Sequence, residues 1–133
     1  MSRPASISKT TVRSSAALTT SYVAGNVIQV QNKNQAHIQV DFTKGAASDG
    51  RIKVEFSEDN SDFYQETYLD IASGSATGAV WSTPIYLHEY ILPATGKYNI
   101  PLPINSQYIK ISAKATTSAV GTLCSVYLVD GIV

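Results

Sequence analysis

Several segments of the chain alternate between apolar and polar residues. Residues 36–42 read AHIQVDF, residues 51–57 read RIKVEFS and residues 108–115 read YIKISAKA. This period of two is typical of strands with one face in a core and the other in water. We expect the first two runs to pair as antiparallel strands. No long run has apolar residues at helical spacing, so the pattern predicts an all-β protein.

The remaining segments extend this prediction to eight to ten short strands. Residues 63–71 and 79–92 are β-prone, and Pro84 interrupts the second of them. Residues 73–78 (SGSATG) are expected to form a flexible loop. Residues 97–104 read KYNIPLPI; because its two prolines donate no ladder hydrogen bonds, we expect an edge strand or a strap across the sandwich.

We expect residues 108–115 and 122–129 to form the last hairpin. Short strands separated by turns about every ten residues favour an antiparallel β-sandwich or jelly roll. Residues 1–26, rich in Ser, Thr and Ala, carry only scattered apolar side chains. They predict an extended N-terminal arm, with at most one weak strand, before a single β-sandwich domain over residues 27–133. In an assembly such an arm can lie across a neighbour.

Two predicted strands do not follow the pattern of one apolar and one polar face. In residues 122–129 one face holds Cys124, Val126 and Leu128, and the other holds Leu123, Tyr127 and Val129. A strand with two apolar faces is expected to be covered on both sides, either by another part of the chain or by a neighbouring subunit.

In residues 85–92, Tyr86, His88 and Tyr90 lie opposite an aliphatic row. Aromatic side chains with polar tips suit recognition of a partner, and with Trp81 they suit stacking on a sugar ring. The same row is also compatible with a polar outer face that has no specific role.

The charge balance argues against a nucleic-acid partner. The 133 residues are 44% hydrophobic and 15% charged, with a formal net charge of zero. A phosphate-binding protein is expected to have a basic excess. Residues 1–40 hold four basic residues and no acid, whereas residues 41–70 hold eight acids and three basic residues. Either both regions are solvated, or the basic arm meets an acidic face of another copy or of a partner.

The chain has no apolar run typical of a secretory signal or a membrane span. Its single cysteine, Cys124, excludes a disulfide within the chain. We therefore expect a protein of a reducing cytoplasm, or of a particle assembled there, without a membrane partner.

No motif indicates catalysis, a cofactor or a metal. His37 and His88 lie far apart in the sequence, and Cys124 lies in an apolar strand where an inert thiol is expected. The acids of residues 58–62 lack the spacing of a calcium loop and predict an ordinary turn. A glycosidase pair drawn from Glu55, Glu66 and Glu89 has little to favour it. We expect a protein that is not an enzyme.

Two stretches resemble known β-sandwich families. Residues 52–64, IKVEFSEDNSDFY, resemble a strand, Ser-x-Asp, turn and aromatic signature of discoidin-like jelly-roll modules. Residues 108–131, YIKISAKATTSAVGTLCSVYLVDG, resemble the final hairpin of small β-sandwich proteins in tailed-phage particles. The single Trp81 departs from sugar-binding discoidin-like modules, which usually expose more Trp and Arg.

The second resemblance implies a decoration or cement protein on the capsid exterior, assembled in the host cytoplasm. Its partners are then the major capsid protein and sister copies, with a trimer favoured. The alternatives are a tail, neck or fibre module, or a carbohydrate-binding module. The candidate partner-binding residues are Arg3, Lys9, Arg13, Tyr86, His88, Tyr90, Leu123, Tyr127 and Val129.

Overall fold

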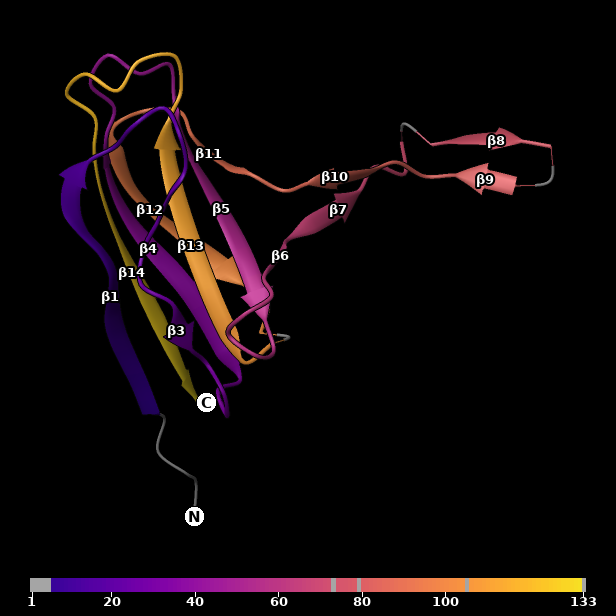
Figure 1. The fold of residues 1–133 in the computed structure, drawn as a ribbon, viewed down its shortest axis with the longest axis horizontal. Coiled ribbons are helices and arrows are strands. Elements are labelled where there is room, and N and C mark those ends of the chain that lie inside the picture. The colour runs from indigo at the N-terminus through magenta and orange to yellow at the C-terminus, as the bar shows by residue number, and fades with distance from the viewer. Residues whose placement is uncertain (1–5, 73, 79, 105, 133) are drawn as a thin grey trace.

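The strands are divided between two antiparallel sheets that pack face to face (Figure 1). The computed structural model describes residues 6–72, 74–78, 80–104 and 106–132. Sheet A has the order β1 (Ser6–Ala17), β14 (Leu123–Ile132), β4 (Gln35–Thr43), β12 (Gly96–Leu102). Sheet B has the order β11 (Tyr90–Leu92), β5 (Gly50–Ser57), β13 (Tyr108–Ala115), β2 (Val23–Ala24), with β3 (Ile28–Gln29) also on β13 and β6 (Tyr64–Gln65) also on β5. The described residues form no helix, which confirms the all-β prediction.

The core lies between the two sheets. Sheet A contributes alternate residues of β4 and β14, and sheet B contributes alternate residues of β5 and β13. The buried side chains include Ile38, Val40, Val126 and Leu128 from sheet A and Ile52, Val54, Ile109 and Ile111 from sheet B. The alternation therefore identified the inner faces of β4, β5 and β13 correctly.

Two expected strand pairings are wrong. β4 pairs with β14 and β12, whereas the next long strand, β5, pairs with β13, β11 and β6 in the other sheet. Likewise β13 and β14 follow each other in sequence but lie in opposite sheets. The reason lies in the connections 44–49 and 116–121, which cross from sheet to sheet. They bond to each other at one end of the sandwich, where Ala46 N–H donates to Val120 O at 2.9 Å and Ser48 N–H to Thr116 O at 2.9 Å.

The N-terminal segment is more ordered than expected. Within residues 1–26, Ser6–Ala17 forms the 12-residue edge strand β1, which pairs along almost the whole of β14. Val12 in β1 and Leu18, directly after β1, are buried in the core. The stretch holds few other apolar side chains. The ladder is interrupted by two register shifts, between Thr11 and Arg13 and between Arg13 and Ala16. An edge strand that buries few side chains gives a weak sequence signal, which explains why only one weak strand was expected here.

β12 is the opposite edge of sheet A, one of the two positions expected from Pro101 and Pro103. Pro101 lies opposite His37 in the register with β4, and the other side of the strand pairs with nothing in the described chain. A residue without an N–H at an edge discourages pairing with further strands.

The remaining strands form a long hairpin that projects from the sandwich, to the right in Figure 1. β7 (Thr67–Leu69) pairs with β10 (Ile85–Leu87), and β8 (Ser75–Thr77) pairs with β9 (Val80–Ser82). Residues 73–78 were expected to form a flexible loop; Ser73 lies outside the described residues, and β8 places most of the rest in a strand. These short elements bring the strands above the expected eight to ten. None of the described residues belongs to a helix that could span a membrane.

Gly50 provides a test of the packing between β4 and β5. A Cβ atom at this position would lie 2.5 Å from the ring of Phe42, a side chain only 2% exposed. We expect Gly50→Ala to lower the free energy of unfolding by about 1–3 kcal/mol, because the buried ring must move. Gly96→Ala is the matched control, since its nearest contact would be an ordinary 3.6 Å from Tyr98. Urea unfolding of both variants measures the difference, and equal stabilities would contradict the packing.

Candidate functional site: the projecting hairpin and the outer sheet faces

The projecting hairpin, defined from here on as Tyr64–Leu92 so that it includes its root strands β6 and β11, carries most of the exposed large hydrophobic side chains among the described residues. Among the described residues, thirteen large hydrophobic side chains are exposed and nine of them lie in this hairpin. They are Tyr64, Tyr68, Leu69, Ile71, Trp81, Ile85, Tyr86, Leu87 and Ile91. A concentration of apolar side chains on one projection marks a surface for interaction with a partner.

One face of the projecting hairpin is aliphatic. The register sets Leu69 opposite Ile85 and Thr67 opposite Leu87, and cross-strand partners lie on the same face. Leu69, Ile85 and Leu87 are 58%, 65% and 64% exposed. We call this the aliphatic face. Nothing in the described chain covers it, so its apolar area stays in water unless another molecule binds.

The opposite face is aromatic and is occupied by its own contacts. The ring centroids of Tyr68 and Tyr86 lie 5.6 Å apart, those of Tyr68 and His88 5.7 Å, and those of His88 and Tyr90 4.2 Å. The Tyr90 hydroxyl donates to Glu66 Oε1 at 2.7 Å, and His88 Nδ1 lies 3.3 Å from the same oxygen. Burial and this hydrogen bond raise the pKa of Tyr90. Tyr86, His88 and Tyr90 thus lie along one face, and Tyr90, at the inner end of this row, packs against the core.

Sequence reasoning missed Tyr68, the fourth ring of the aromatic face. Tyr68 comes from β7 and joins the row only because β7 pairs with β10. Trp81 lies farther out, in β9, opposite Ala76. Its indole lies against Gly74, where an added Cβ would approach Nε1 to 2.7 Å.

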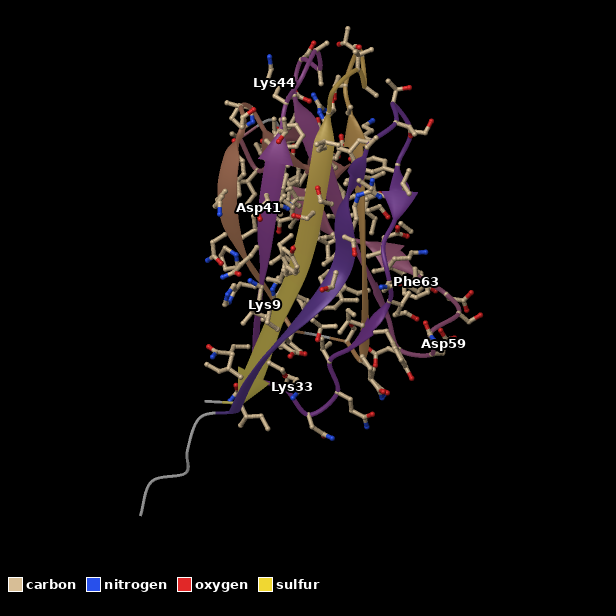
Figure 2. All side chains as sticks on the ribbon, turned by 90° about the vertical axis from the view of Figure 1, so that its left-hand side faces the viewer. Lys9, Lys33, Asp41, Lys44, Asp59 and Phe63 are labelled. Atoms are coloured by element: carbon tan, nitrogen blue, oxygen red, sulfur yellow. The ribbon has the colours of Figure 1, made fainter. Side chains whose placement is uncertain are left out.

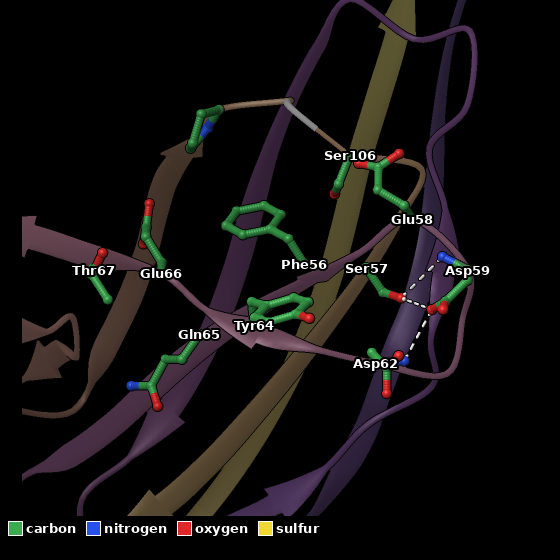
Figure 3. Close-up of a pocket in the computed structure, with 11 residues that line it drawn as sticks. Phe56, Ser57, Glu58, Asp59, Asp62, Tyr64, Gln65, Glu66, Thr67 and Ser106 are labelled. Atoms are coloured by element: carbon green, nitrogen blue, oxygen red, sulfur yellow. Dashed lines mark hydrogen bonds between the residues drawn. The ribbon is translucent and has the colours of Figure 1, made fainter.

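An open cleft of about 650 Å³ lies at the root of the projecting hairpin (Figure 3). Phe56 and Tyr64 line it together with the acids of the 58–62 turn. Asp59 organises that turn: its Oδ1 accepts hydrogen bonds from Ser57 Oγ at 3.0 Å and from the N–H groups of Ser61 and Asp62 at 2.9 Å. These bonds, the backbone ones first, lower the pKa of Asp59. Among the described residues, no three His, Cys, Asp or Glu side chains are grouped to hold a metal ion.

The outer face of sheet A carries most of the other candidate residues, and it faces the viewer in Figure 2. The register places Lys9, Val129 and His37 in one row and Thr11, Tyr127 and Gln39 in the next. Lys9 Nζ lies 4.6 Å from the centroid of the Tyr127 ring. Leu123, at the start of β14, is 42% exposed. On the outer face of β14, Tyr127 and Val129 are half-buried, and Ser125, between Leu123 and Tyr127, is only 4% exposed.

Arg13 has a structural role in this face. Its guanidinium donates to the carbonyl oxygens of Cys124 at 3.2 Å, Ala16 at 3.3 Å and Ala17 at 2.7 Å. These bonds span the irregular part of the β1–β14 ladder, where the backbone lacks regular partners. Arg3, the remaining basic candidate, lies outside the described residues.

The Cys124 thiol points into the core between the sheets. The side chain is fully buried, and burial raises its pKa to about 11. A thiol with a raised pKa is almost entirely protonated at neutral pH and is a poor nucleophile.

The outer face of sheet B holds a network of charges around Tyr22. The Tyr22 hydroxyl donates a hydrogen bond to Glu89 Oε2, and Arg51 Nη1 lies 3.4 Å from Glu89 Oε1. Lys53 and Lys114 each place Nζ 4.8 Å from the centroid of the Tyr22 ring. This network ties the segment before β2 to the root of the projecting hairpin, because Glu89 directly precedes β11.

Together these surfaces define an antiparallel β-sandwich with one long, apolar hairpin projecting from it. No protein-family model matches the chain, and no curated protein matches it. Among solved structures the chain is similar to the SPBc2 prophage-derived protein YomS, at 13% sequence identity and a TM-score of 0.52. The match covers 98% of this chain and 97% of that chain. The likeness shows a common fold over nearly the full length of both proteins.

Glu89 gives a prediction for the pH dependence of stability. The hydrogen bond from Tyr22, and then the charges of Lys114 and Arg51, hold the pKa of Glu89 below its ordinary value. A depressed pKa means that the carboxylate stabilises the fold above the ordinary pKa of Glu, and that this stability is lost as the pH falls through the lower, folded-state value. We expect Glu89→Gln to lower the free energy of unfolding by about 1 kcal/mol at pH 7.

The difference between wild type and Glu89→Gln should shrink as the medium becomes acidic, because the wild-type carboxyl is then neutral as well. Urea unfolding between pH 7 and pH 3 measures it. Glu58→Gln, at an exposed turn position, is the control. A constant difference across this pH range would show that the charge of Glu89 is not what stabilises the network.

Proposed function

We propose that the protein is a non-enzymatic structural protein of a bacteriophage particle, and that the projecting hairpin joins it to neighbouring subunits. The observation that carries this proposal is the exposed aliphatic face formed by Leu69, Ile85 and Leu87. An apolar hairpin held away from its own core gains stability only when another molecule covers it. Permanent assembly in a particle supplies such a cover.

The phage origin is supported by two independent likenesses. The fold is shared with a prophage-derived protein over nearly its whole length. Residues 108–131 resemble the final strands of small β-sandwich proteins of tailed phages, and in this structure they form β13 and β14, the central strands of the two sheets.

A structural role is also supported by how the reactive groups are used. Cys124 is buried with a raised pKa. Asp59 orders a turn, and Glu66 and Glu89 bind tyrosine hydroxyls. These side chains stabilise the fold and the root of the projecting hairpin.

The finer form of the proposal places the protein on the capsid exterior, bound to the major capsid protein and to sister copies. This position follows from the resemblance to decoration proteins. The projecting hairpin would serve equally in a tail or a neck, so the position in the particle decides between them.

Electron microscopy of gold-labelled particles tests this proposal. Antibodies against the purified protein are applied to intact particles of the phage that carries its gene, with a particle lacking the gene as control. We expect gold on the capsid surface. Gold confined to the tail or neck would keep the virion role and reject capsid decoration. Particles without label, and without the protein by mass spectrometry, would reject the virion role.

A further inference from the structure

We propose that the cleft at the root of the projecting hairpin binds a neutral saccharide. This inference goes beyond the proposed function and does not depend on it, because none of Leu69, Ile85 and Leu87 lines the cleft. It rests on the size of the cleft, on an exposed aromatic ring inside it, and on the hydrogen-bonding groups around that ring.

Three parts of the chain meet at the cleft. Phe56, near the end of β5, packs partly against the core. The register of β5 with β6 places Tyr64 directly opposite Phe56, and cross-strand partners lie on the same face. A further wall comes from Pro103 and Ser106, in the connection between β12 of sheet A and β13 of sheet B. The resulting volume of about 650 Å³ is usual for a small-molecule site.

Tyr64 supplies an aromatic surface inside this cleft. Its side chain is 73% exposed, which makes it the most exposed aromatic residue of the described chain. Its hydroxyl makes no hydrogen bond within the described residues. Figure 3 shows the rings of Tyr64 and Phe56 at the middle of the lining. The C–H groups of a sugar ring pack on an exposed aromatic face, while the sugar hydroxyls remain free to bond at the sides.

Hydrogen-bonding groups surround the rings on two sides (Figure 3). Glu58 and Asp62 lie on the side of the turn, and Gln65 and Thr67 lie on the side of the projecting hairpin. The carboxylates of Glu58 and Asp62 are exposed and accept no hydrogen bond within the described chain. The Gln65 amide donates through Nε2 to His88 O at 3.2 Å, which leaves its oxygen as an acceptor. Most of the free groups are therefore acceptors, as a ligand with several hydroxyl donors requires.

The acids of the cleft are spread out and do not converge on one point. Asp59 Oδ1 is occupied by Ser57 Oγ and by backbone N–H groups of its own turn. Glu66 Oε1 is occupied by the Tyr90 hydroxyl and by His88 Nδ1. Consistent with this, no group of acids, His or Cys in the described ranges is placed to hold a metal ion. Separated acceptors suit several hydroxyls better than they suit a single cation.

The charge of the cleft selects against anionic ligands. Of the described residues that line it, four are acids and none is lysine or arginine. A concave surface lined by charges of one sign concentrates their field, so phosphate groups and acidic sugars are repelled. A neutral saccharide offers hydroxyl donors without this repulsion. The four acids are Glu58, Asp59, Asp62 and Glu66.

The test uses the full chain and four variants. Tyr64→Ala removes the exposed ring, and Tyr64→Phe keeps it. Asp62→Asn removes one carboxylate at constant size. Tyr86→Ala is the matched control, because Tyr86 is an exposed tyrosine of the same hairpin that does not line the cleft. Circular dichroism and urea unfolding establish that each variant folds.

A glycan array with neutral, acidic and amino saccharides identifies the ligand, and saturation-transfer NMR with neutral monosaccharides at millimolar concentration detects weak binding. We expect binding to neutral saccharides only. Titration calorimetry with the strongest neutral glycan then compares the variants. Tyr64→Ala should weaken binding roughly tenfold or more, because the packing surface is lost. Asp62→Asn should weaken it roughly tenfold, because a hydrogen bond to a charged acceptor is lost. Tyr64→Phe and Tyr86→Ala should bind like the wild type.

Three outcomes overturn the inference. The first is a wild type that binds no neutral saccharide on the array or by NMR. The second is binding confined to acidic or amino saccharides, which rejects the class of ligand. The third is neutral binding that persists in Tyr64→Ala and is lost in Tyr86→Ala, which places the ligand on the aromatic face. The virion role is decided separately by the gold-labelled particles and stands or falls without this site.

Discussion

The structure depends on the burial of β14 between its neighbours and against sheet B. The inner face of this strand, Cys124, Val126 and Leu128, is at most 1% exposed. Its backbone pairs with β1 on one side and β4 on the other, so it is the strand through which β1 joins sheet A. The ladder with β4 runs without interruption from Leu123 to Gly131, whereas the ladder with β1 contains two register shifts. On the outer face of β14, Leu123 is exposed, Tyr127 and Val129 are half-buried, and Ser125 is covered.

The crossing loops at one end of the sandwich complete this arrangement. Gly45 has φ of +57°, and an added Cβ would lie 2.5 Å from Val120 O. The Thr122 hydroxyl donates to Lys44 O at 2.8 Å. These contacts join the connection that leaves β4 to the one that enters β14. Sequence-adjacent strands are thereby forced into opposite sheets, and the two long strands of each sheet come from distant parts of the chain.

This explains which parts of the fold could be predicted from sequence. The period of two is a local property, so the inner faces of β4, β5 and β13 follow from it, and so does the edge position of a strand that contains Pro101. Pairing partners are not local. They are set by how the connections pack at the end of the sandwich, and the sequence carries no periodic signal for that packing.

The candidate site was predictable to a similar degree. Alternation in residues 85–92 separated an aromatic row from an aliphatic row, but it did not show which of the two faces water. The answer depends on Tyr90, whose register partner Ile52 points into the core, so that the aromatic row continues the inner side of sheet B. A two-stranded ribbon is marginally stable alone in water. The stacked rings and the Glu66 hydrogen bonds stiffen the root of the projecting hairpin. Because that face supplies the rigidity, the aliphatic face is presented already ordered, and a partner that covers it loses less conformational entropy on binding than it would with a mobile loop.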